Sequence, residues 1–126
     1  MPVRSLNSSV FTWPDATTVS QALHRWAQGV VQNHAGVVRI GYFGSYARSD
    51  WGVGSDLDVV IIVKASCHPF HQRALDWDVT ALPVPADVMV YTQDEWDTMA
   101  RAQERFFRTV DGEVIWVYGK NSMPQE

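Results

Sequence analysis

The segment from Leu57 to Val63 constrains the fold more than any other part of the chain. After Asp58 it reads Val-Val-Ile-Ile-Val, and β-branched residues of this kind favour a strand. Successive side chains of a strand point to opposite faces, so apolar residues here occupy both faces. The segment therefore predicts a strand that other elements cover on both sides.

Strands and helices are expected to alternate along the rest of the chain. Thr18 and Gln21 have capping-box spacing at the start of a helix that Gly36 ends. Ser45 is expected to cap a short helix after the Gly44 turn. Further strands are expected at 37–43, 87–91 and 114–118, and further helices at 70–77 and about 93–108. The expected fold class is therefore α/β (α+β), with residues 64–82 ambiguous.

The length of 126 residues suits a single domain. We expect an N-terminal arm over 1–14, the domain over 15–118 and a C-terminal tail over 119–126. The net charge of −4 and the pI near 5.4 argue against stable nucleic-acid binding, which needs clustered Lys and Arg. One cysteine, no signal peptide and no membrane-spanning apolar run fit a cytoplasmic protein without membrane association.

Asp56 and Asp58 lie two residues apart at the start of the apolar strand. Because residues i and i+2 of a strand share a face, both carboxylates should point to one place. Two such charges repel each other unless a cation lies between them, and in phosphoryl-transfer chemistry that cation is usually Mg²⁺. Asp87 begins another strand and faces the same cleft if the two strands are neighbours. An ordinary acidic residue at a strand start remains almost as good an interpretation of Asp87.

Gly44 and Ser45 follow the strand over 37–43 and would place backbone N–H groups at a helix start. Such groups can bind the β- and γ-phosphates of a nucleotide. A glycine at position 44 lets the backbone come close to a phosphate. Arg48 has two interpretations, because it could reach a phosphate or form a structural ion pair with Asp50 or another carboxylate.

Together these residues resemble the signature of the polymerase-β-like nucleotidyltransferase superfamily. The minimal nucleotidyltransferase group of this superfamily has the pattern Gly-Ser-x-Ala-Arg-Gly, followed after five further residues by Ser-Asp-x-Asp-Leu. Here Gly-Ser-Tyr-Ala-Arg-Ser begins at Gly44, and Ser-Asp-Leu-Asp-Val begins at Ser55 with the same spacing. Asp87 matches the third acidic position, whereas Ser49 stands where the group usually has Gly.

The resemblance implies a single-domain nucleotidyltransferase fold, with a mixed β-sheet flanked by helices. It also implies one or two Mg²⁺ ions and ATP as the donor substrate. The catalytic and metal-binding residues would be Asp56, Asp58 and Asp87. The nucleotide-binding positions would be Gly44, Ser45, Arg48 and Ser55.

Three functions follow from the resemblance. The first is transfer of AMP from ATP to a hydroxyl, such as a tyrosine of a helical HEPN-type partner in a toxin–antitoxin-like module. The second is a non-catalytic antitoxin or nucleotide-binding subunit that neutralises a helical partner by occlusion. The third is a small-molecule nucleotidyltransferase that completes its acceptor pocket with a second copy, in a homo-oligomer, or with another chain.

Overall fold

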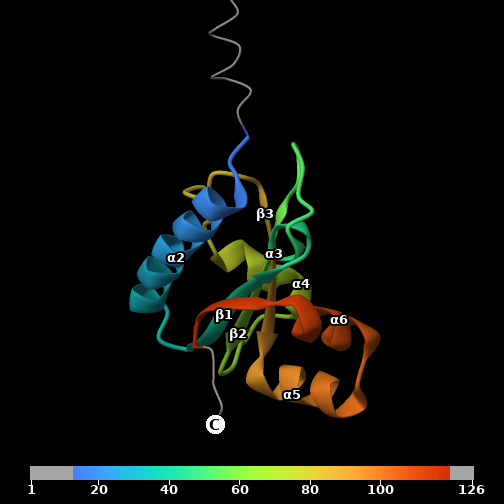
Figure 1. The fold of residues 1–126 in the computed structure, drawn as a ribbon. Coiled ribbons are helices and arrows are strands. Elements are labelled where there is room, and N and C mark those ends of the chain that lie inside the picture. Colours follow the sequence, from blue (N-terminus) through green and yellow to red (C-terminus); the bar gives the residue numbers. More distant parts are fainter. Residues whose placement is uncertain (1–12, 120–126) are drawn as a thin grey trace, which may run out of the picture.

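The computed structural model describes residues 13–119, so the expected arm and tail lie almost entirely outside the described residues. Four strands form one sheet: β1 (Val37–Phe43), β2 (Leu57–Val63), β3 (Ala86–Thr92) and β4 (Ile115–Tyr118). Their order is β3-β2-β1-β4 (Figure 1). β1 runs antiparallel to β2 and β4, whereas β2 and β3 are parallel. The expected mixed sheet is therefore confirmed.

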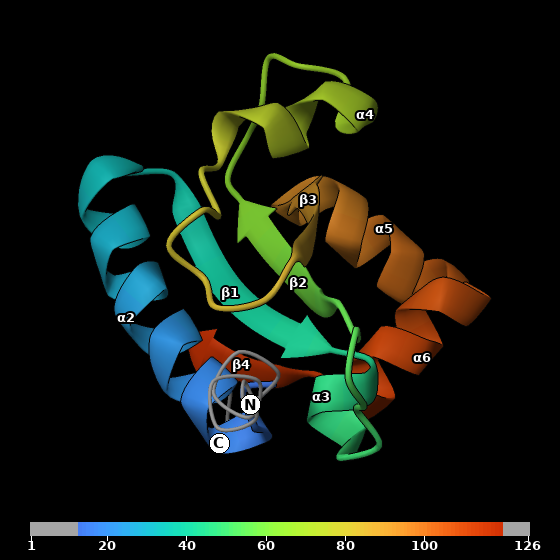
Figure 2. The same ribbon diagram turned by 90° about the horizontal axis from the view of Figure 1, so that it is seen from above.

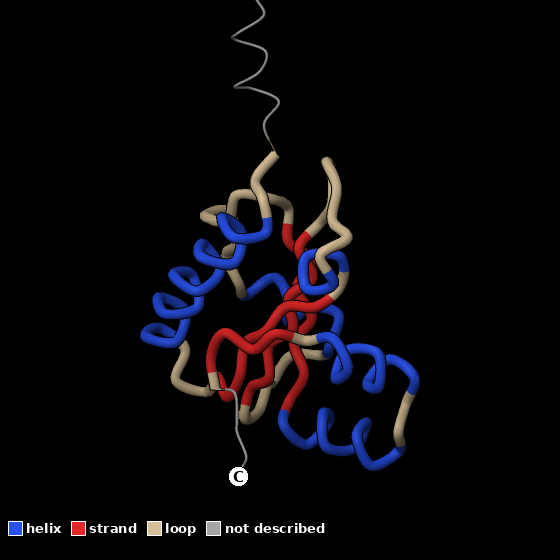
Figure 3. The backbone as a smooth tube through the Cα atoms, in the orientation of Figure 1, coloured by secondary structure: helices blue, strands red, loops and turns tan. Residues whose placement is uncertain are grey.

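Helices cover both faces of the sheet (Figure 2). Helix α2 (Ala16–Asn33) packs on one face, where Leu23 meets Val59 and Ile61 in one apolar core. Helices α5 (Gln93–Ala102) and α6 (Arg105–Glu113) cover the other face, where Val60 and Ile62 form a second core. Figure 3 shows the strands in the middle of this arrangement. The two-sided covering expected from the apolar run of β2 is confirmed.

Helix α2 begins two residues before the expected start at Thr18. Asp15 is the N-cap, because its carboxylate accepts a hydrogen bond of 2.8 Å from the Thr18 N–H. An aspartate at this position satisfies one of the free N–H groups of the first turn. The apolar face of the helix then buries Val19, Leu23 and Trp26.

The short helix α3 (Ser45–Arg48) follows β1 directly. Its N-cap is Gly44 rather than the expected Ser45, and no side chain caps it. Gly44 has φ 78° and ψ −154°, a region that essentially only glycine occupies. The sharp turn is thus made by the backbone freedom of Gly44.

The prediction of one continuous helix over 93–108 is wrong, because the structure has two helices in this region. A capping box of Thr92 and Glu95 does begin α5, but the chain leaves the helix at Gln103, which has φ 52°. Helix α6 then continues through Gly112, where a turn was expected. The break lets Trp96 of α5 and Phe107 of α6 pack edge to face at 4.9 Å between ring centroids. Burial of both aromatics outweighs continuation of one helix.

The ambiguous region 64–82 contains α4 (Phe70–Arg73) and a 3₁₀ turn, η1 (Ala74–Asp76), close to the expected helix at 70–77. Arg73 is buried and donates to both carboxylate oxygens of Glu95, at 2.6 and 3.0 Å. It also donates to the Val90 carbonyl at 3.1 Å. These bonds tie α4 to α5 and β3. Among residues 13–119, no helix is both long and apolar enough to cross a membrane.

Candidate active site

Asp58 and Asp87 are direct partners in the parallel pair of β2 and β3. Asp58 shares its face with Val60 and Ile62, because side chains two apart on a strand point the same way. Asp87 likewise shares its face with Met89, which packs in that same core under α5 and α6. The two carboxylates therefore lie side by side on one face of the sheet, Asp58 half-buried and Asp87 exposed.

Asp56 lies just before β2 and is exposed. The pKa of Asp58 is raised above its ordinary value, first by burial and then by the charges of Asp87 and Asp56. Glu113 raises it further, and only Arg48 acts in the opposite direction. Asp58 is thus surrounded mainly by negative charge, as the two-residue spacing had suggested.

The Gly44 turn lies against this carboxylate. A Cβ atom at position 44 would overlap the Asp58 Oδ2 atom. Only a residue without a side chain lets the end of β1 approach Asp58 so closely. The turn and the acidic pair, which are separate motifs in the sequence, therefore form one site.

Glu113, the last residue of α6, is part of the same site and was missed in the sequence. Its Oε1 atom accepts hydrogen bonds from the Gly44 N–H at 2.7 Å and from Arg48 Nη1 at 3.1 Å. The Nε atom of Arg48 also donates to Asp50 at 3.0 Å, so the ion-pair interpretation of Arg48 is confirmed. No local pattern marks Glu113, because it reaches the turn from 69 residues away.

The loop between α3 and β2 holds Ser55 in place. The Ser55 hydroxyl accepts from the Gly52 N–H at 2.8 Å, and the Ser55 N–H donates to the Gly52 carbonyl at 3.0 Å. Ser49 ends α3 with φ 69°, a left-handed conformation that favours glycine. The loop thus keeps a glycine-type geometry although a serine occupies the position.

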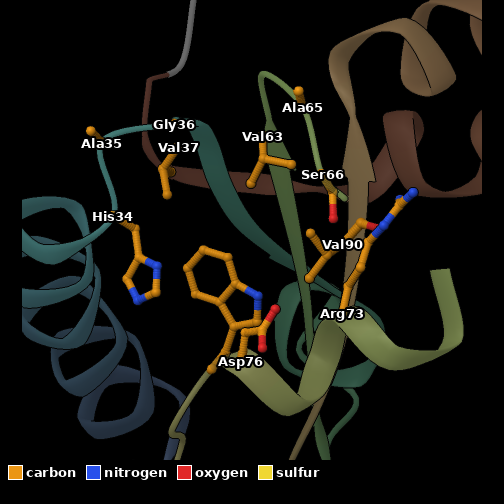
Figure 4. A pocket seen from close by; sticks show the side chains of 11 residues that line it. His34, Ala35, Gly36, Val37, Val63, Ala65, Ser66, Arg73, Asp76 and Val90 are labelled. Carbon is orange, nitrogen blue, oxygen red and sulfur yellow. The ribbon is translucent and has the colours of Figure 1, made fainter. Parts of the chain in front are cut away.

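A cavity of about 470 Å³ lies at the other end of the sheet (Figure 4). His34 stacks on Trp77 beside it, with ring centroids 4.4 Å apart. Val63, which lines this cavity, comes five residues after Asp58 on β2, or about 17 Å along an extended strand. The cavity and the acidic site are therefore separate places on the molecule.

Residues 24–109 match the family model for a nucleotidyltransferase domain, which covers more than half of the chain. The chain belongs to this family. The resemblance to the polymerase-β-like superfamily is thereby confirmed. The matched residues include the Gly44 turn and all three aspartates, whereas Glu113 lies beyond them.

Solved structures resemble this nucleotidyltransferase domain as well. One, from Sulfolobus solfataricus and described as a candidate nucleotidyltransferase, is 15% identical, with 80% of each chain covered and a TM-score of 0.57. It shows the same fold. A toxin–antitoxin structure solved with AMP-PNP is 14% identical, covering 78% of this chain and 74% of the other, with a TM-score of 0.49. No curated protein sequence matches the chain.

The donor atoms of this nucleotidyltransferase domain fit a magnesium site that substrate helps to complete. Within residues 13–119, no three His, Cys, Asp or Glu side chains already converge as a ready-made metal site. Mg²⁺, however, is usually held by one or two carboxylates together with substrate phosphates and water. Asp58 and Asp87 supply two adjacent hard oxygen ligands, and the surplus negative charge around Asp58 favours a cation.

Proposed function

We propose that this domain transfers a nucleoside monophosphate, AMP from ATP, to a hydroxyl acceptor in a Mg²⁺-dependent reaction. The observation that carries the proposal is the pairing of Asp58 with Asp87 beside the Gly44 turn. Asp56, Asp58 and Asp87 would hold one or two Mg²⁺ ions, which neutralise triphosphate oxygens and favour attack at the α-phosphorus. Gly44, Ser45, Arg48 and Ser55 would form the nucleotide side of the site.

In the proposed reaction the acceptor oxygen forms a bond to the α-phosphorus of ATP. The bond between that phosphorus and the oxygen bridging to the β-phosphate breaks, and pyrophosphate leaves with the bonding electron pair. The acceptor hydroxyl loses its proton, and we assign Asp87, whose side chain is exposed, as the group that accepts it. The Gly44 turn and Arg48 orient the phosphates so that the leaving group lies in line with the attacking oxygen.

The acceptor that we propose is a tyrosine hydroxyl on a helical, HEPN-type partner protein in the cytoplasm. Asp56 and Asp87 are exposed, so a large acceptor can approach the carboxylates directly. Val53, in a turn three residues before Asp56, is 80% exposed and offers an apolar contact. A protein surface supplies both an apolar contact and a tyrosine.

Label transfer from ATP carrying ³²P in the α-phosphate tests this function. The chain is incubated with MgATP and a co-expressed helical partner, and labelled protein is detected on a denaturing gel. We expect labelling by the wild type, none by Asp58→Asn, and wild-type labelling by Asp94→Asn, an equal charge change on α5. Absence of transfer from the folded wild type to any supplied hydroxyl, with or without a partner, would contradict catalysis.

A non-catalytic subunit that blocks a partner by occlusion is the second candidate. It is favoured by the observation that Glu113 already engages Gly44 and Arg48, two groups assigned to the phosphates. The test is an Asp56→Asn/Asp58→Asn double variant, which should still bind and neutralise the partner if occlusion suffices. Loss of neutralisation in a folded double variant favours the catalytic function instead.

A further inference from the structure

Glu113 links the end of α6 to the candidate active site through two hydrogen bonds. A single oxygen atom, Oε1, accepts from both the Gly44 N–H and the Arg48 guanidinium. The side chain of Glu113 is only 20% exposed, whereas that of Arg48 is 47% exposed. The two donors come from the turn after β1 and from α3, and only the folded chain brings Glu113 to them.

The two donors are of the kind that binds phosphate. A guanidinium pairs strongly with phosphate oxygens, and a backbone N–H donates to them without a side chain in the way. In this structure both donate to a carboxylate, which is also an anion. One N–H group cannot donate a full hydrogen bond to Glu113 and to a phosphate at the same time. The two anions must therefore compete for the Gly44 N–H.

We propose that Glu113 is a displaceable internal ligand of the donor site, which holds the Gly44 N–H and one N–H of Arg48 until a triphosphate displaces it from the Gly44 turn. This inference rests on the proposed nucleotide-binding function and adds a residue that sets the affinity for the donor. The negative charge of Glu113 adds to that of the three aspartates, so a triphosphate approaches an acidic site. Release of Glu113 lowers that charge next to the phosphates.

The local structure allows this release without unfolding of the helix. Glu113 is the last residue of α6, and the helix end is closed by a separate hydrogen bond of 2.7 Å from the Val114 N–H to the Val110 carbonyl. Rotation of the Glu113 side chain therefore breaks no helical hydrogen bond. Arg48 keeps its bond to Asp50 when Glu113 leaves, so the guanidinium remains held near the site.

Titration calorimetry with MgATP, and with inorganic tripolyphosphate without metal, tests the inference. We compare the wild type with Glu113→Gln and Glu113→Ala, because glutamine keeps the shape and hydrogen-bonding capacity but loses the charge. Both variants should bind both probes about tenfold more tightly, equivalent to about 1.4 kcal/mol. Glu104→Gln is the control, since it makes the same charge change at the exposed start of α6 and should bind like the wild type.

The outcomes separate this inference from the function on which it rests. Unchanged or weaker binding by folded Glu113→Gln, when the wild type binds MgATP, overturns the inference but leaves the proposed function standing. Weaker MgATP binding with unchanged tripolyphosphate binding also overturns it, because Glu113 would then act as a metal ligand. If neither the wild type nor any folded variant binds either probe, these residues do not form a donor site, and both proposals fail. Circular dichroism and thermal melting confirm that each variant is folded.

Discussion

Gly44 and Asp58 lie so close together that a methyl group on Gly44 would overlap the Asp58 carboxylate. This contact joins the turn after β1 to the first acidic residue of β2. It also explains why the turn and the acidic pair, ten or more residues apart, act as one unit. The contact leaves no room for a side chain at position 44.

Gly44→Ala should remove label transfer from ATP and lower the melting temperature. Alanine at φ 78° and ψ −154° costs on the order of 1–3 kcal/mol, and its Cβ atom pushes the Asp58 carboxylate aside. Gly29→Ala is the control, because a Cβ there meets no atom within 4 Å. That variant should be more stable by roughly 1 kcal/mol, as alanine favours a helix over glycine. Full transfer activity in Gly44→Ala would show that the turn geometry is dispensable.

Asp58→Asn should raise the thermal stability at neutral pH while it removes label transfer. The pKa of Asp58 is raised in the folded protein, chiefly by burial, so the folded state binds a proton more tightly than the unfolded state. Stability therefore falls as the pH rises from the ordinary value of 3.8 through the raised pKa, and the loss is complete above it. Asparagine carries no charge at any of these pH values, so the variant does not lose stability in this way.

Melting temperatures between pH 3 and pH 7 check this prediction. The advantage of Asp58→Asn over the wild type should shrink as the pH falls through the raised pKa. Added Mg²⁺ should narrow the gap at neutral pH, because the cation stabilises only the charged wild-type site. A variant less stable than the wild type at pH 7 would mean that Asp58 makes a favourable contact outweighing its charge.

Ser49→Gly should stabilise the protein by about 1 kcal/mol, since a left-handed conformation costs non-glycine residues roughly that much. Ser49 has φ 69° at the end of α3. Ser20→Gly, inside α2, is the opposite control and should destabilise by about 0.5 kcal/mol, the difference between the helix propensities of serine and glycine. Urea unfolding of both variants gives their free energies of unfolding. A loss of stability in Ser49→Gly would contradict the inference that the left-handed conformation of Ser49 is strained.

Arg73→Met should destabilise the protein by about 2 kcal/mol, because it removes charge-assisted hydrogen bonds to Glu95 and leaves the Val90 carbonyl without this donor. The bond with Arg73 lowers the pKa of Glu95 below its ordinary value of 4.5. The contribution of the pair is therefore complete above that value and is lost as the pH falls through the lowered pKa.

Unfolding of Arg73→Met at several pH values measures this effect. The difference from the wild type should be largest above pH 5 and should shrink in acid. Arg101→Met is the matched control, because within residues 13–119 Arg101 donates only to the exposed Thr98 hydroxyl, at 3.2 Å, so its loss should cost little. If both substitutions lower the free energy of unfolding equally, the ion pair of Arg73 and Glu95 contributes no more than side-chain packing.

The bounds of β1 and β2 were predictable because each segment is rich in apolar residues, interrupted by Arg39 and Gly41 in β1 and by Asp58 in β2, and is followed by a local stop signal. The end of α5 was not, because neither glycine nor proline marks it. Gln103 adopts its left-handed conformation because the packing of Trp96 against Phe107 requires the chain to turn there. Local propensity decides where an element can form, but packing between elements decides where this one ends.

The sequence by itself determined that Asp58 and Asp87 each lie near the start of a strand and that Gly44 makes a sharp turn, because these are properties of residues close together in the chain. Only the tertiary structure decided that β2 and β3 pair in the register that sets Asp58 beside Asp87. It also decided that Glu113 reaches the Gly44 N–H across 69 residues. Strand register and helix placement follow from burial of the whole apolar surface, which no short segment specifies.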